Sequence, residues 1–185
     1  MAPRLGFPQH TPFRRRKARN SASFTRLREP RPVWTGEPLD LFDRLERHWY
    51  PGPARDDSDR QKRATEEDIA KFEAEHGVKV PEDFREYLLR FNGIEEDPEV
   101  FRFWPLHELR PVDLKSFRVP DRERYFFFAD YLIECFYYAI YLGDRPELQN
   151  WVVIPCMPRQ PFVAVNFTGF IELYLDDARA IYGPA

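Results

Sequence analysis

The side chains best suited to catalysis in this 185-residue sequence are four histidines and two cysteines. Histidine can transfer protons near neutral pH, and a cysteine thiolate can act as a nucleophile or bind a metal ion. The histidines are scattered along the chain, at His10, His48, His76 and His107. No two of them have the spacing of metal ligands, and Cys135 and Cys156 do not form a CxxC pair. This arrangement predicts neither a catalytic centre nor a metal site.

Other catalytic patterns are also absent from the sequence. It contains no GxSxG nucleophile motif and no glycine-rich phosphate-binding loop. The adjacent carboxylates Glu66-Glu67 and Asp176-Asp177 stand at predicted helix ends, where solvated or capping roles are expected. Both cysteines lie in apolar segments typical of strands, which predicts that they are buried and inert. We therefore expect a protein that is not an enzyme, holds no cofactor and works through its surface.

The net charge of −3 conceals two segments of opposite sign. Met1–Arg31 carries nine Lys or Arg residues against one acid, a net charge of +8, while the rest of the chain has 19 basic and 30 acidic side chains, a net charge of −11. The first segment contains several prolines and few large apolar residues, so burial cannot offset the entropy of ordering it. We predict a disordered basic tail over residues 1–33 and a folded domain over residues 34–185.

One dense basic cluster lies in this tail, made of Arg14, Arg15, Arg16, Lys17 and Arg19. Such a cluster can bind nucleic acid weakly or act as a localisation signal. An Arg-rich start with few acids also resembles an organellar transit peptide, although prolines interrupt the amphipathic helix that such a peptide needs. The simplest interpretation is a solvated tail without a dedicated partner, or residues upstream of the true translation start.

The distribution of apolar residues and cysteines indicates a cytoplasmic location. No apolar run approaches the ~20 residues that a membrane-spanning helix needs, and no apolar segment of a secretion signal lies near Met1. The two cysteines do not make a disulfide framework. We expect a cytoplasmic protein without a membrane partner.

An acidic segment is the most informative candidate for binding a partner. The stretch IEEDPEV, residues 94–100, carries Glu95, Glu96, Asp97 and Glu99. Proteins that hold nucleic acid need basic clefts for the phosphates, and an acidic protein that plugs such a cleft would associate with it quickly. We therefore take these four acids as candidate partner-binding residues; the alternative is a solvated loop without a partner.

Three helices are predicted before this acidic segment. Apolar residues at four-residue steps predict the first over residues 39–49. Thr65 and Asp68 can cap the start of the second, and Gly77 can end it. The third begins after Pro81 and carries an apolar stripe, made of Phe84, Tyr87, Leu88 and Phe91.

Strand patterns dominate the next part of the chain. Alternating or aromatic-rich runs predict strands over residues 100–104, 125–130, 135–142, 151–156 and 162–165. Asn166 can cap a last helix, which begins at Phe167. Successive strands with short links favour an antiparallel sheet of about four to six strands. The predicted fold class is α+β, with N-terminal helices and a C-terminal helix.

The segment ATEEDIAKFEAEHGVKVPEDFREYLLRFNG, residues 64–93, resembles the signature of the SUKH superfamily. The similar features are its Ala-Thr-Glu-Glu opening, its Val-Pro-Glu-Asp-Phe centre and its Phe-Asn-Gly ending. The later stretches FWPLHEL, YFFFAD and NFTGFIELYLDD resemble a strand and turn, a central strand and the C-terminal helix of the superfamily. The stretch IECFYYAIYL, residues 133–142, differs from it, because it is more aromatic than the usual glycine-bearing hairpin. The resemblance covers residues 34–182.

The resemblance implies an α+β domain that binds proteins without catalysis. The superfamily joins a yeast regulator of cell-wall synthesis to many bacterial proteins that neutralise polymorphic toxins. Three hypotheses follow: an immunity protein that blocks a toxin domain, a regulatory or scaffold protein of the yeast type, or a nucleic-acid binder that acts through the basic tail. The third is the weakest, because the acidic domain would repel the same ligand.

Overall fold

The computed structural model describes residues 39–51, 62–95, 100–145, 150–157 and 162–181. By its internal contacts the chain divides into Met1–Gly36 and Glu37–Ala185, and every described residue belongs to the second unit. Three helices precede the sheet: α1 (Leu41–Trp49), α2 (Glu66–His76) and α3 (Glu82–Arg90). Two follow it: α4 (Phe167–Asp176) and α5 (Ala178–Ile181). The predicted basic tail and its cluster from Arg14 to Arg19 lie outside the described residues.

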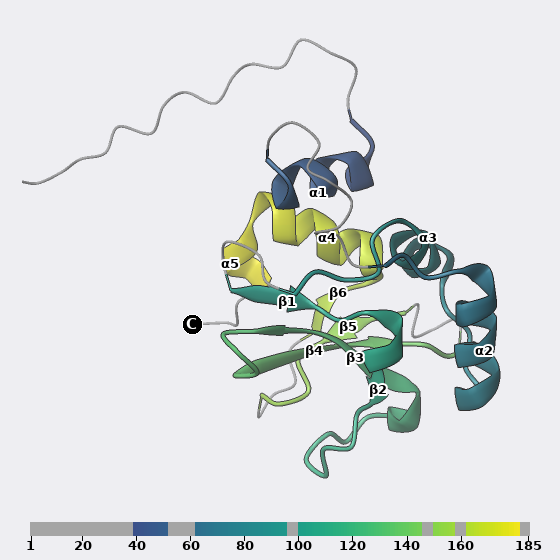
Figure 1. Cartoon of the computed structure of the whole chain (residues 1–185). Coiled ribbons are helices and arrows are strands. Elements are labelled where there is room, and N and C mark those ends of the chain that lie inside the picture. The colour runs from purple at the N-terminus through teal and green to yellow at the C-terminus, as the bar shows by residue number, and fades with distance from the viewer. Residues whose placement is uncertain (1–38, 52–61, 96–99, 146–149, 158–161, 182–185) are drawn as a thin grey trace, which may run out of the picture. The chain divides into compact units, whose positions relative to one another are not determined.

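The described strands form one antiparallel sheet, as predicted (Figure 1). Its order is β1-β3-β4-β5-β6, and β2 pairs with β3 off this path. The strands are β1 (Phe101–Phe103), β2 (Arg110–Pro111), β3 (Tyr125–Tyr131), β4 (Phe136–Tyr141), β5 (Val152–Val153) and β6 (Phe162–Ala164). Together with the flanking helices, this sheet confirms the predicted α+β class. Strand β2 was not predicted, because two residues, one of them a proline, leave no pattern to detect.

Aromatic side chains fill the layer between the helices and the sheet. Figure 1 shows α1, α3 and α4 on one side of the sheet. Phe84 of α3 packs on Phe167 of α4 with ring centroids 4.8 Å apart, and Phe128 of β3 packs on Phe170 of α4 at 5.2 Å. All four residues of the predicted stripe on α3 are buried, which confirms the predicted face: Phe84, Tyr87, Leu88 and Phe91.

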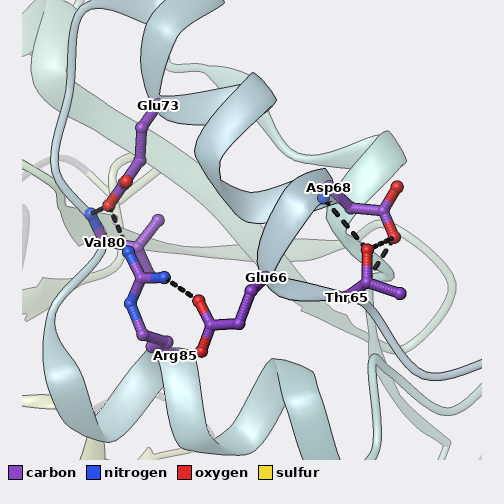
Figure 2. Close-up of polar contacts among 6 residues, drawn as sticks. All are labelled: Thr65, Glu66, Asp68, Glu73, Val80 and Arg85. Carbon is purple, nitrogen blue, oxygen red and sulfur yellow. Dashed lines mark hydrogen bonds and ion pairs between the residues drawn. The ribbon is translucent and has the colours of Figure 1, made fainter.

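The start of α2 has the predicted cap (Figure 2). The Thr65 hydroxyl oxygen accepts a hydrogen bond from the Asp68 N–H at 3.1 Å, and the Asp68 carboxylate accepts one from the Thr65 N–H at 2.9 Å. Hydrogen bonds from the Thr65 hydroxyl and from its backbone lower the pKa of Asp68. Gly77 ends the helix in the left-handed conformation, as predicted.

One arginine joins α2 to α3 (Figure 2). Arg85 donates a hydrogen bond to Glu73 at 2.7 Å and also pairs with Glu66. Glu73 accepts a second hydrogen bond from the Val80 N–H at 2.8 Å, which fixes the link between the two helices. The segment over residues 64–93 therefore serves as a scaffold, the scaffold motif of this fold.

The burial of the two cysteines differs from the prediction. Both are exposed, whereas the apolar segments around them predicted burial. Strand pairing begins at Phe136, one residue after Cys135, and β5 ends at Val153, before Cys156. The thiols therefore lie in turns, because the strands are shorter than the apolar runs that predicted them.

Candidate protein-binding surface at the β3–β4 turn

The turn between β3 and β4 has an unusual backbone. Leu132, Ile133 and Glu134 all have positive φ angles, of 54°, 52° and 64°. For an L-amino acid this left-handed conformation is uncommon, and it is a clear outlier for a β-branched residue such as isoleucine. Strained backbone of this kind persists only where its surroundings hold it, and it gathers at binding and catalytic sites. The turn is therefore a candidate functional site.

A buried carboxylate holds this turn from below. Asp130, the sixth residue of β3, is 2% exposed. Its carboxylate accepts one hydrogen bond from the Glu134 N–H at 2.9 Å and another from the Trp104 indole N–H at 2.6 Å. The Leu132 N–H donates to the Val100 carbonyl at 3.1 Å. These bonds fix the left-handed residues in place.

A tyrosine of β4, paired across the strands with Asp130, also supports the turn. The Tyr137 hydroxyl donates a hydrogen bond to the Glu134 carboxylate at 3.0 Å. Partial burial and this carboxylate raise the pKa of Tyr137, so its hydroxyl stays protonated and able to donate. The Tyr137 ring also packs edge-on against Trp104, with centroids 5.9 Å apart.

The turn presents apolar side chains to solvent. Ile133 is 82% exposed and Leu132 is 42% exposed. Among the described residues, the other large apolar side chains with comparable exposure are Phe162 and Val165. Scattered exposed apolar residues need no explanation, but two neighbours on a rigid, strained turn are suited to insert into a partner.

A hollow of about 260 Å³ lies beside the turn. It is lined by Glu95, Val100, Phe101, Arg102, Asp130, Ile133 and Glu134. Glu95 and Glu134 are exposed, while Arg102 is paired with Glu108 at 2.7 Å. The surface therefore combines an apolar projection, a small hollow and two carboxylates that can pair with cations of a partner.

Only one of the four predicted partner-binding acids can be placed. Glu95 lines the hollow beside the turn. Glu96, Asp97 and Glu99 lie outside the described residues, and their role stays a prediction. Ile133 and Glu134 were not among the predicted partner-binding residues. A signal was present, because the link between the predicted strands at 125–130 and 135–142 contains no glycine, asparagine or proline. A tight turn without those residues forces ordinary residues into left-handed backbone.

Two of the described histidines contact aromatic rings, whereas His107 is exposed. His76, in the last turn of α2, lies against Phe72 with ring centroids 4.6 Å apart and against Phe126 at 5.1 Å. His48 meets Tyr174 edge-on at 5.3 Å. Within the described part of the chain, no three His, Cys, Asp or Glu residues come together as a set of metal ligands.

Comparison with known protein families gives one match. The family model of the SMI1 / KNR4 family (SUKH-1) matches residues 63–173, which span the chain from just before α2 into α4. No curated protein matches the chain. None of the helices in the described segments is long and apolar enough to cross a membrane. The matched region holds the scaffold motif, the turn and its hollow, and it covers more than half of the sequence. The chain therefore belongs to the SMI1 / KNR4 family (SUKH-1).

Proposed function

We propose that this chain is a non-enzymatic immunity protein, which neutralises a basic toxin domain by binding it directly in the cytoplasm. The observation that carries the proposal is the β3–β4 turn, where Ile133 projects beside the carboxylates of Glu95 and Glu134. Buried apolar anchors provide most of the affinity at protein interfaces, and surrounding charges provide orientation and speed of association. The turn offers both at one place.

The charge of the chain supports a basic partner. From residue 32 onward the chain carries 30 acidic and 19 basic side chains. A toxin that acts on nucleic acid needs a basic cleft, so it would be attracted to this domain and to the acidic stretch 95–99 in particular. The same field would repel nucleic acid from the domain.

A regulatory or scaffold role of the yeast cell-wall type is the second candidate. The basic cluster around Arg14–Arg19 supports it, because a protein that binds a basic toxin has no evident use for such a cluster. Gene neighbourhood separates the two candidates: an adjacent gene for a large secreted toxin supports immunity, and an isolated gene in a fungal genome supports regulation. Nucleic-acid binding that disappears when Met1–Arg31 is removed would instead support a role for the tail.

Neutralising the acidic stretch should slow association with the partner. The variant carries Glu95→Gln, Glu96→Gln, Asp97→Asn and Glu99→Gln, and the partner is the toxin domain encoded beside the gene or the protein captured with the tagged chain. Exposed charges act mainly on the association rate and are screened beyond roughly 8 Å at physiological ionic strength. Stopped-flow or surface-binding kinetics at two salt concentrations should show slower association at low salt and little change in dissociation.

A control variant with the same change of net charge tests whether the effect depends on the position of the acids. Glu86, Asp113, Glu123 and Glu172 are exposed acids that do not line the hollow. Neutralising these four should slow association less than neutralising residues 95–99. Equal association rates for both variants would show that only overall charge matters, and the acidic stretch would not be the contact site.

Replacing the apolar projection should act on dissociation instead. Ile133→Ser removes an 82% exposed side chain, so it should weaken partner binding about tenfold or more, mostly through faster dissociation, with little loss of fold stability. Phe162→Ser on β6 is the matched control, because Phe162 is another exposed apolar residue outside the hollow. If Phe162→Ser weakens binding and Ile133→Ser does not, the contact surface lies on β6.

A further inference from the structure

We propose a second binding site on this chain, a groove between α2 and the 3-10 turn η2 (Leu106–Glu108) that takes an acidic peptide segment with one large apolar side chain. This site does not depend on the proposed function, because it shares no lining residue with the hollow beside the β3–β4 turn. Its ligand would also have the opposite charge to a basic toxin. The floor, the walls and the rim of the groove each favour such a ligand.

The floor of the groove is apolar. The groove has a volume of about 450 Å³, within the range of ligand pockets. Four apolar residues reach its surface while nearly all of their area is buried: Ala64, Phe72, Leu106 and Leu109. A leucine or phenylalanine side chain of a bound peptide would be removed from water against them, which is the main favourable contribution to such binding.

The walls of the groove are fixed by buried hydrogen bonds. Asn92 donates from its side-chain amide to the Lys62 carbonyl at 2.7 Å and accepts from the Leu106 N–H at 2.8 Å. The Ala64 N–H donates to the Leu88 carbonyl of α3 at 3.2 Å. Three segments distant in sequence are thus tied together, and a groove built this way exists before a ligand arrives. A preformed site loses little entropy on binding.

The rim of the groove carries basic side chains, although the domain is acidic. Lys62, Arg63 and Lys71 stand at the groove against two carboxylates, Asp68 and Glu75. Asp68 is already bonded to Thr65, and Glu75 pairs with Lys71 at 3.8 Å.

Two of these bases, Lys62 and Arg63, are exposed and make no ion pair within the described part of the chain. Lys62 still acts at longer range on Asp68, whose pKa its charge helps to lower. In a domain with excess acid, two adjacent bases beside an apolar floor favour an anionic ligand. His76 and His107 also line the groove.

These features select the chemistry of the ligand. The apolar floor requires one large apolar side chain, and the basic rim requires carboxylates on the residues that flank it. A peptide segment with a leucine between acidic residues supplies both groups along one short chain.

The test uses a labelled nine-residue peptide of Glu and Asp around a central Leu, with the full-length chain. Fluorescence anisotropy should show saturable binding that weakens with added salt. A peptide with Ser in place of the Leu should bind about tenfold or more weakly, since it lacks the apolar anchor. A peptide with Lys in place of the acids should not bind.

Charge reversal locates the site on the protein. The double variant Lys62→Glu with Arg63→Glu should weaken binding of the Leu peptide about tenfold or more, because like charges then face its carboxylates. The control is Lys115→Glu with Arg118→Glu, which reverses two exposed bases outside the groove and should leave binding unchanged. Thermal unfolding of both variants confirms that they fold. No saturable binding to the wild type, equal binding to the Ser peptide, or equal loss in both variants would each overturn the proposal.

Discussion

Replacing Leu88 by alanine is expected to lower the free energy of unfolding by about 2–5 kcal/mol. Leu88 lies on the buried face of α3 and is 0% exposed. The substitution removes packed atoms from an interior of large aromatic rings, and neighbouring elements hold α3 on several sides. The core can therefore close only part of the cavity, which places the cost well above that of an average substitution.

Urea denaturation followed by tryptophan fluorescence or circular dichroism measures this loss as a shift of the midpoint at constant slope. Glu86→Ala is the control on the same helix, because Glu86 is exposed and its replacement should change stability by less than about 0.5 kcal/mol. A near-neutral result for Leu88→Ala would mean that α3 packs through a different face.

Replacing Gly93 by alanine is expected to cost about 3 kcal/mol or more. Gly93 has a φ angle of +100°, where an L-residue is strained by about 1–3 kcal/mol. An added Cβ would also lie 2.7 Å from the Phe103 carbonyl oxygen and 2.9 Å from the Pro105 nitrogen. Both contacts are with backbone, so no side-chain rotation relieves them. The chain beside β1 would have to move away from the end of α3.

Gly77 supplies a control that separates strain from collision. It has a φ angle of +62°, but an added Cβ would meet nothing within 4 Å. Gly77→Ala should therefore cost only the backbone strain, about 1–2 kcal/mol. Thermal or urea unfolding of both variants should show the larger loss for Gly93→Ala. Equal losses would contradict the close approach of β1 to Gly93.

Local patterns explain which elements could be predicted. The caps at Thr65 and Asn166 and the stop at Gly77 depend on residues close in sequence, and the structure has all three. The apolar stripe of α3 is likewise a local spacing. Strand ends were less accurate, because pairing between strands decides where a strand stops and an apolar run can continue into a turn. Cys135 and Cys156 lie where an apolar run continues past the end of a strand, and both are therefore exposed.

The candidate surface could be predicted only in part. The acidic stretch is visible as composition, so Glu95 could be proposed as a candidate. Glu134 reaches the same hollow from a different hairpin, and only the sheet register brings the two together. The hydrogen bond between Trp104 and Asp130 joins the residue that follows β1 to β3, so no sequence spacing reveals it. Contacts between segments that are distant in sequence leave no periodic pattern, so they could not be predicted from the sequence.

The left-handed turn has a consequence for laboratory evolution of this protein. Each of Leu132, Ile133 and Glu134 holds a conformation that costs an L-residue about 1–2 kcal/mol and costs glycine nothing sterically. A library at these three codons selected for heat resistance alone should therefore accumulate glycine. The same library selected for capture of the partner should keep a large apolar residue at position 133. Two screens of one library would thus select different residues at the same codons. The difference would measure how much folding stability the turn loses in order to bind the partner.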